Sequence, residues 1–89
     1  MWYVYILQCS DGTFYTGITE HLKERIGKHN AGKGAKYTRS RRPVTLVFFE
    51  ECESQLEAIK REIKIKKLSH YNKQQIIKWR KRVSLAMHK

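Results

Sequence analysis

The sequence predicts one α/β domain of the α+β type, in which a three-stranded, mostly antiparallel sheet is flanked by helices in the order β-β-α-β-α-α. Three observations support this fold class. The chain has 89 residues, 40% of them hydrophobic, which suits a single compact domain. Two β-branched and aromatic runs lie on either side of a short turn near its start. Amphipathic helical patterns fill its second half. We place the domain at residues 1–83 and expect residues 84–89 to fray.

Three segments have the composition of strands. Residues 2–8 (WYVYILQ) are β-branched and aromatic, as buried strands are. A turn at Ser10-Asp11-Gly12 makes residues 13–18 the second arm of a hairpin. The third strand is expected at 44–51 (VTLVFFEE), directly after Pro43, because proline cannot donate a backbone hydrogen bond within a sheet.

The first helix is predicted between a capping residue and a pair of glycines. Thr19 can cap a helix over about residues 20–30, and Gly32 and Gly34 end it. The segment 32–43 is basic and lacks apolar periodicity, so we expect it to be a loop.

Two further helices follow the third strand. Ser54 and Glu57 form a capping box, which opens a helix that continues to about Leu68. Ser69 can cap a last helix that ends near Val83. Since the sequence contains neither a repeat nor a linker, these elements belong to one domain.

The chain is strongly basic, with 19 Lys and Arg against 8 Asp and Glu and a formal net charge of +11. No basic residue precedes Lys23, and no acidic residue follows Glu62. Such uncompensated blocks favour a polyanionic partner, nucleic acid before a membrane surface. No apolar run reaches the ~18 residues of a membrane span. Because Cys9 and Cys52 are too few for a disulfide framework or a zinc site, we expect a reduced, cytoplasmic protein, compatible with nucleoid association.

Glu62 is the residue that packing alone does not explain. At about 100° per residue, five apolar side chains of its helix share one arc. They are Leu56, Ala58, Ile59, Ile63 and Ile65. Glu62 projects into the middle of this arc, where a lone carboxylate is costly to desolvate. A salt bridge to a nearby arginine and a role as metal ligand or catalytic acid explain it equally well.

The first helix carries a matching pair on its edge. Leu22 and Ile26 form its core stripe, whereas Arg25 and His29 are four residues apart, so that one ligand can touch both side chains. The pair can clamp a phosphate and transfer a proton, or Arg25 can meet Glu62 structurally. Taken singly, a histidine such as His29 is more often a partly exposed surface residue.

Two hairpin registers are open. A two-residue loop would place Tyr5 and Tyr15 on opposite faces of the sheet. A three-residue loop with Gly12 in the left-handed region would place both hydroxyls on one face and Tyr5 opposite Gly17. Gly17, inside a strand, indicates a close backbone approach or a bulge.

Together these residues resemble the GIY-YIG nuclease domain family, in particular its small stand-alone bacterial branch. The first triplet corresponds to Tyr3-Val4-Tyr5 and the second to Tyr15-Thr16-Gly17. The segment 22–29 (LKERIGKH) is similar to the family's helix with its arginine and downstream histidine, and Glu62 matches its single metal-binding glutamate. The segment 32–43 resembles the basic loop of that branch. The resemblance covers about residues 2–80.

The resemblance implies cleavage of phosphodiester bonds with a single Mg²⁺ or Mn²⁺ ion held by Glu62, and with no organic cofactor and no zinc. Arg25 would stabilise charge on the scissile phosphate. One of Tyr5 and Tyr15 would help to deprotonate the attacking water, with His29 assisting. The resemblance also selects the three-residue loop at Gly12, which brings both tyrosines to the catalytic face.

The sequence departs from the family pattern at three positions. Tyr3 stands at the glycine of the first triplet, Thr16 at the middle of the second, and Ile18 where some active relatives carry a basic residue. Family nucleases usually have a separate targeting domain, and none fits in 89 residues, so we expect a targeting protein partner. A monomer is favoured.

Two basic segments would then hold the substrate, DNA in preference to RNA, through phosphate contacts that add affinity but little sequence choice. The candidate residues are Lys33, Lys36, Arg39, Arg41, Arg42, Lys78 and Arg80. Trp79 could stack on a base, although packing inside the domain is the favoured interpretation.

Two alternatives remain open. One is a non-catalytic nucleic-acid-binding module with the same fold, and the other is a basic protein that docks on RNA or on an acidic partner. Glu62 favours the nuclease, because a pure binder gains nothing from a carboxylate beside phosphates.

Overall fold

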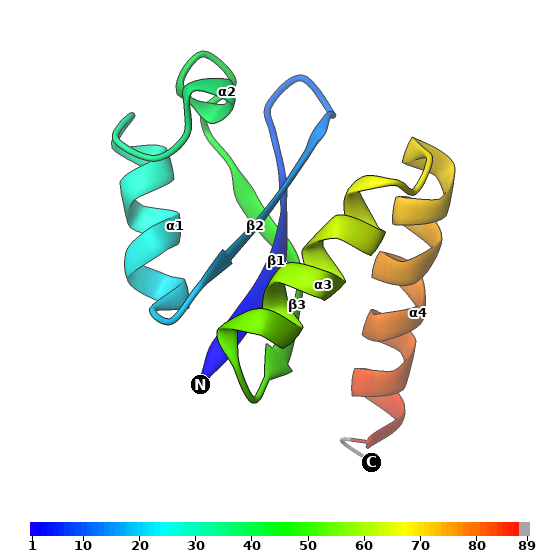
Figure 1. Cartoon of the computed structure of the whole chain (residues 1–89). Helices are drawn as coiled ribbons and strands as arrows, with labels where there is room; N and C mark the ends of the chain where they lie inside the picture. Colours follow the sequence, from blue (N-terminus) through cyan, green and yellow to red (C-terminus); the bar gives the residue numbers. More distant parts are fainter. Residues whose placement is uncertain (88–89) are drawn as a thin grey trace.

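The computed structural model describes the backbone of residues 1–87 and the side chains of residues 1–82. A three-stranded antiparallel sheet lies between α1 and α2 on one face and α3 and α4 on the other (Figure 1), so the predicted fold class is confirmed. The elements in chain order are β1 (Trp2–Gln8), β2 (Phe14–Thr19), α1 (Leu22–Asn30), α2 (Lys36–Arg39), β3 (Thr45–Cys52), α3 (Gln55–Lys66) and α4 (His70–Met87).

β1 is the central strand, in the order β2-β1-β3, and it pairs antiparallel with both neighbours. The β1–β2 hairpin has the three-residue loop: Cys9 N donates to Thr13 O at 2.8 Å. Gly12 has a φ of 85°, a left-handed conformation that costs glycine little. The register places Tyr5 opposite Gly17, as this loop predicts.

The two faces of β1 carry separate cores. On one face Val4 and Ile6 pack with Phe48, Cys52, Ala58, Ile65 and Ile77. On the other face Tyr5 and Leu7 pack with Cys9, Val44, Tyr15, Leu22 and Ile26. Because Tyr5 and Tyr15 belong to the second core, both tyrosines lie on the side of the sheet that α1 covers.

The buried side of α3 differs from the predicted one. Ala58 and Ile65 are fully buried, whereas Leu56 and Ile63, expected in the core, are 61% and 47% exposed. At about 100° per residue, Leu56 and Ile63 lie near one end of the apolar arc, and Ala58 and Ile65, which pack on the sheet, lie near the other end. Because the arc spans about half of the helix, its two ends cannot both face the sheet, and Leu56 and Ile63 are left exposed.

A short helix, α2, forms inside the segment 32–43, where the sequence predicts a loop. The observed order is therefore β-β-α-α-β-α-α. α2 is one turn long: Arg39 N donates to Ala35 O at 3.2 Å, and Thr38 is its buried residue. A single turn with one buried side chain has no apolar periodicity, so the pattern could not indicate it.

Other helix ends differ by a few residues from those expected. α1 begins at Leu22, and Thr19 Oγ1 accepts a hydrogen bond from His21 N at 3.1 Å ahead of the helix rather than capping it directly. α3 ends at Lys66 rather than near Leu68. α4 continues to Met87 instead of ending near Val83, and the remainder of the predicted tail, residues 88–89, lies outside the described residues.

Two predicted caps are confirmed. Ser54 Oγ accepts from Glu57 N at 3.2 Å at the start of α3, and Ser69 Oγ accepts from Asn72 N at 3.1 Å at the start of α4. Cys9 and Cys52 are buried free thiols. Within residues 1–87, none of the helices has both the length and the apolar composition that crossing a membrane requires.

Candidate active site

Three buried side chains form a hydrogen-bonded chain between β1, α1 and α2. The Tyr5 hydroxyl lies 2.9 Å from His29 Nε2, and His29 Nδ1 lies 2.8 Å from Thr38 Oγ1. Tyr5 is 1% exposed, and His29 and Thr38 are fully buried. His29 is therefore not the partly exposed surface residue that a single histidine most often is, because both of its ring nitrogens are engaged inside the protein.

The donors and acceptors of this chain assign the proton on His29. Thr38 Oγ1 lies 3.0 Å from Ala35 O, which can only accept, so the single hydroxyl proton is donated there. The same oxygen must then accept from His29 Nδ1–H. Nε2 is left without a proton and accepts from the Tyr5 hydroxyl. The Ala35 amide, 3.5 Å from Nδ1, is too distant to compete with the 2.8 Å contact.

Burial favours the neutral forms of both rings. It lowers the pKa of His29, and the positive charge of Arg25 lowers this pKa further. Burial raises the pKa of Tyr5, while the guanidinium of Arg25 opposes that shift and the charges of Tyr15 and Glu62 add to it. A neutral imidazole whose Nε2 carries no proton and accepts from a neutral phenol is equipped to take up a proton.

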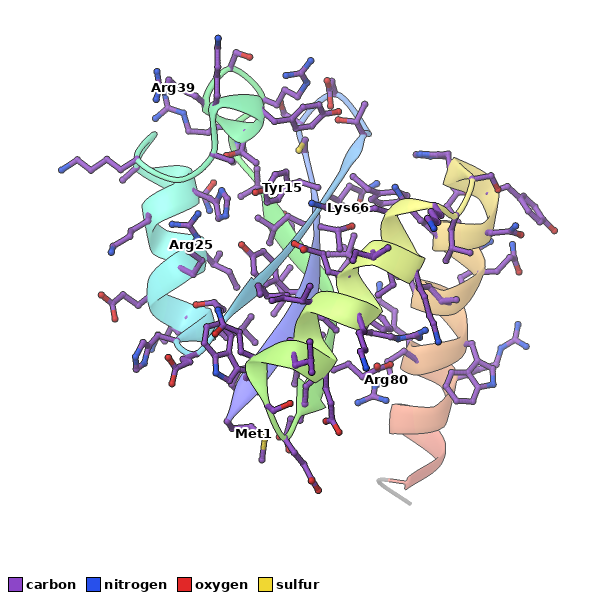
Figure 2. All side chains as sticks on the ribbon, viewed as in Figure 1. Met1, Tyr15, Arg25, Arg39, Lys66 and Arg80 are labelled. Atoms are coloured by element: carbon purple, nitrogen blue, oxygen red, sulfur yellow. The ribbon has the colours of Figure 1, made fainter. Side chains whose placement is uncertain are left out.

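Tyr15 and Arg25 border the chain. The ring of Tyr15 is centred 5.1 Å from that of His29, on the face that the three-residue hairpin loop predicts. Arg25 extends from α1 on the side that faces the sheet (Figure 2) and lines an open cleft of about 330 Å³. Its positive charge lowers the pKa of His29 and opposes the rise in the pKa of Tyr5.

Glu62 reaches the same region from α3. Its side chain is 19% exposed, and its Oε2 lies 3.5 Å from Lys66 Nζ. Among the described side chains its ion pair is thus with a lysine, not with the arginine that a purely structural role suggested. The charge of Glu62 adds to the raised pKa of Tyr5, as the smallest of its causes.

The donor groups around Glu62 limit the kind of metal ion that the carboxylate could hold. Among the described residues, no three His, Cys, Asp or Glu side chains converge in a way that would hold one. A divalent ion at Glu62 would therefore take one protein ligand and complete its shell with water and substrate oxygens. Mg²⁺ suits such a site because it keeps several of its waters, and the partly exposed carboxylate is reachable from solvent. The residues fit a metal site with one carboxylate.

Two glycines make room for the chain. A Cβ atom at Gly17 would lie 2.6 Å from the Tyr5 hydroxyl, which explains the glycine in the middle of β2 as a close approach. A Cβ atom at Gly34 would collide with the imidazole of His29. The phenol and the imidazole therefore sit where only glycine is tolerated.

The predicted nucleic-acid-binding residues fall into two groups. Lys33, Lys36, Arg39 and Lys78 have exposed side chains, and Arg80 is half-buried in the groove between β3 and α4. Arg41 and Arg42 are engaged within the protein.

Arg41 Nε donates to Asp11 Oδ2 at 3.0 Å, and the guanidinium lies 3.9 Å above the centre of the Tyr37 ring. Arg42 Nε donates to Arg39 O at 2.8 Å. These two arginines therefore also hold the segment around α2 in place. Trp79 is 62% exposed, so its expected packing is wrong.

Sequence reasoning missed Thr38 and Gly34. Thr38 lies in a segment dominated by basic residues, and nothing in the sequence distinguishes its hydroxyl from those of other threonines. The sequence pattern explains Gly34 as a helix terminator alone. Its proximity in sequence to His29 was the one available signal of a close approach.

Known proteins resemble this chain over almost its whole length. Residues 1–82 match the GIY-YIG catalytic domain family. A UPF0213 protein of Desulfotalea psychrophila is 56% identical over 78 residues, which make up 86% of this chain and 71% of that protein. A UPF0213 protein of Halobacterium salinarum is 53% identical over 74 residues, 83% of this chain and 96% of that protein.

Solved structures agree with this relationship. The NMR structure of a UPF0213 protein from Bacillus halodurans is similar with a TM-score of 0.58 at 48% identity, over 89% of this chain and 85% of that one. The NMR structure of a protein from E. faecalis gives 0.59 at 46% identity, over 85% and 81% of the two chains. The family match spans every residue of the site from Tyr5 to Glu62, and the chain belongs to the GIY-YIG catalytic domain family.

Proposed function

We propose that this domain is an endonuclease that cleaves phosphodiester bonds in DNA and depends on a single divalent metal ion. The hydrogen-bonded chain of Tyr5, His29 and Thr38 carries the proposal, because it joins a phenol to a neutral imidazole beside Arg25. Hydrolysis needs a group that accepts the proton of the attacking water. A module that only binds nucleic acid has no use for such a buried proton acceptor.

The proposed reaction follows from the positions of these groups. Tyr5 takes a proton from the attacking water while its own hydroxyl proton passes to His29 Nε2. The water oxygen forms the new bond to phosphorus, and the departing oxygen leaves with the electrons of the broken P–O bond and is protonated by solvent. Arg25 stabilises the negative charge that grows on the phosphate. Tyr15, on the same face, is the other candidate proton acceptor.

Glu62 is the residue that would hold the ion. Bound Mg²⁺ or Mn²⁺ would polarise the scissile phosphate and stabilise the departing oxygen. The exposed basic residues near α2 and on α4 would bind the flanking phosphates, which gives a strong dependence of affinity on salt.

The test is cleavage of labelled linear duplex, single-stranded, nicked and branched DNA, and of RNA, with Mg²⁺, Mn²⁺ or EDTA. A Glu62→Gln variant purified in parallel controls for contaminating nucleases. We expect the wild type to cut DNA only with metal. The variant should not cut, and it should bind DNA at least as tightly because a negative charge beside the phosphates is gone.

Other results would point elsewhere. Salt-sensitive binding without cutting by the wild type would identify a non-catalytic nucleic-acid-binding module. Cutting of RNA alone would overturn the DNA assignment. If circular dichroism shows that Glu62→Gln fails to fold, the ion pair with Lys66 is structural, and Arg25→Ala becomes the catalytic control.

A further inference from the structure

A separate cavity of about 190 Å³ lies beside the candidate active site. It is lined by Phe14, Tyr15, Thr16, Tyr37, Lys66 and Lys73. The two lysines come from different elements, Lys66 from the last turn of α3 and Lys73 from the first turn of α4. Figure 2 shows Lys66 extending from α3 toward Tyr15, the residue that the cavity shares with the catalytic face.

Thr16 gives an independent indication that the cavity receives a polar group. Its side chain is 4% exposed, and within the described residues its Oγ1 has no hydrogen-bond partner. Buried hydroxyls are almost always paired, since an unpaired one destabilises the free protein. Thr16 lines the cavity, and its Oγ1 is covered in the free protein. A rotation of the Thr16 side chain about χ1 would turn the hydroxyl toward the cavity, where a ligand atom would supply the missing partner.

The charge and the size of the cavity indicate which ligand that is. Lys66 has one carboxylate neighbour, Glu62, at 3.5 Å, and Lys73 forms no ion pair with any described residue. No acidic residue follows Glu62 in the sequence. At about 190 Å³ the cavity is smaller than the roughly 300–1,000 Å³ of ordinary small-molecule pockets, so it suits a phosphate rather than a whole nucleoside.

We propose that Lys66, Lys73 and Thr16 bind one backbone phosphate of the substrate that flanks the scissile phosphate. This proposal rests on the proposed function, because the phosphate belongs to the strand that Arg25 and Tyr5 act on. Lys66 connects the candidate active site with the cavity, because its ammonium group contacts the Glu62 carboxylate and its side chain lines the cavity. The hydroxyl of Thr16 donates to a phosphate oxygen, and the two ammonium groups balance its charge.

The first test compares two double variants with the same charge change. Lys66→Ala/Lys73→Ala removes the cavity lysines, and Lys60→Ala/Lys64→Ala removes two exposed lysines of α3 that do not line the cavity. Binding of a fluorescein-labelled DNA oligonucleotide, single-stranded and duplex, is measured in EDTA over a series of salt concentrations. EDTA prevents metal-dependent cutting, so affinity is read without chemistry.

We expect the cavity variant to lose roughly tenfold or more in affinity, as the loss of a charge-assisted contact predicts. Its plot of log K against log[salt] should become shallower by about 0.7–0.9, which corresponds to one phosphate. The α3 surface variant should change both quantities much less. Equal losses in the two variants, or none in either, would overturn the phosphate site.

Thr16→Val tests the hydroxyl. Removal of an unpaired buried hydroxyl should raise the melting temperature of the free protein by a few degrees and yet weaken binding of the same oligonucleotide. A merely structural threonine would change stability without changing affinity, which would remove Thr16 from the site. If the double lysine variant does not fold, the single variants Lys66→Gln and Lys73→Gln replace it.

Failure of this proposal differs from failure of the nuclease assignment. If the wild type never cuts DNA, but the cavity variant loses more affinity than the α3 surface variant, the phosphate site is present and the nuclease assignment is wrong. If the wild type cuts DNA, but the two double variants lose the same affinity or none, the nuclease assignment stands and the phosphate site is wrong. A wild type that binds no nucleic acid overturns both.

Discussion

The Tyr5 hydroxyl and His29 Nε2 lie 2.9 Å apart, although 24 positions separate these residues in the sequence. The hairpin register makes this contact reachable, because it places Tyr5 opposite Gly17 and the missing side chain there leaves room for the phenol. Thr38 holds the other side of the imidazole at 2.8 Å. Three elements thus fix the direction in which His29 can accept a proton.

The first prediction concerns the pH dependence of stability. The pKa of His29 is lowered in the folded protein by burial and by Arg25. Below pH 6.5, the pKa of about 6.5 in the unfolded chain, the unfolded protein therefore binds more protons than the folded one. The unfolding free energy then decreases as the pH is lowered, by up to about 1.4 kcal/mol per pH unit. The stability that neutral His29 contributes is therefore fully present above pH 6.5 and is lost as the pH falls toward the pKa of His29 in the folded protein.

Urea unfolding at a series of pH values measures the effect. The wild type should lose stability below pH 6.5, and His29→Gln should lack this part of the pH dependence. His21→Gln, which changes an exposed histidine, should retain it. A slope that His29→Gln leaves unchanged would show that His29 is not buried in its neutral form.

Thr38 is predicted to position His29 rather than to touch the substrate. Thr38→Val leaves His29 Nδ1–H without its acceptor, so the unfolding free energy should fall by about 1–3 kcal/mol. Thr38→Ser keeps the hydroxyl, so its unfolding free energy should be close to that of the wild type. The specific readout is the ¹⁵N NMR spectrum of the imidazole. The Nδ1–H form should dominate in the wild type and in Thr38→Ser, and its population should fall in Thr38→Val.

This readout separates positioning from packing. If Thr38→Val is less stable but His29 keeps its Nδ1–H form, Thr38 fills space and does not set the tautomer. If the protein cleaves DNA, the pH–rate profile of Thr38→Val should shift as well, because the proton-accepting form of His29 is then populated differently.

Arg25 is predicted to serve the chemistry more than the affinity. Its charge stands beside Tyr5 and His29, whereas the exposed lysines around α2 and on α4 provide the longer-range attraction. Arg25→Ala should lower the single-turnover cleavage rate by about 10²–10³, the cost of removing one donor that stabilises the transition state. DNA affinity in EDTA should change several-fold at most.

Lys36→Ala is the matched control for charge. It should weaken DNA binding without a comparable loss of rate at saturating enzyme, because its side chain is exposed on α2. A result in which Arg25→Ala loses affinity and rate in the same proportion would make Arg25 a binding residue instead.

The sequence was sufficient where local rules govern the structure. The Ser54 and Ser69 caps and the sheet followed from short-range chemistry. The position of the hairpin glycine, Gly12, limited the register to two choices, and the family resemblance selected the observed one. The four-residue spacing of Arg25 and His29 likewise predicted one side of the helix for both, and both side chains lie on the side of α1 that faces the sheet.

The sequence was insufficient where distant segments meet. Thr38 matters because α2 packs its single buried residue against His29, a tertiary contact without local periodicity. The exposure of Leu56 and Ile63 depends on which part of the wide apolar arc of α3 packs on the sheet, and Ala58 and Ile65 occupy that position. Whether Trp79 is buried depends on which face of α4 packs on the rest of the domain, and Ile77, not Trp79, lies on that face.

Gly17 gives the sharpest test of the geometry. A Cβ atom there would lie 2.6 Å from the Tyr5 hydroxyl and 2.8 Å from the ring carbon that bears it, so Gly17→Ala must displace the phenol from His29. We expect a loss of about 1–3 kcal/mol in unfolding free energy from overpacking, together with loss of cleavage. Both effects are measured on the same preparation, by urea unfolding and by the DNA cleavage assay.

Gly27→Ala is the control for this substitution. Gly27 lies in α1, and a Cβ atom there would have no described atom within 4 Å. Alanine should therefore stabilise the helix by about 0.5–1 kcal/mol and leave cleavage unchanged. If Gly17→Ala is as stable and as active as Gly27→Ala, cleavage does not depend on the position of the Tyr5 phenol opposite Gly17. The hydrogen bond from Tyr5 to His29 then cannot be what activates the water.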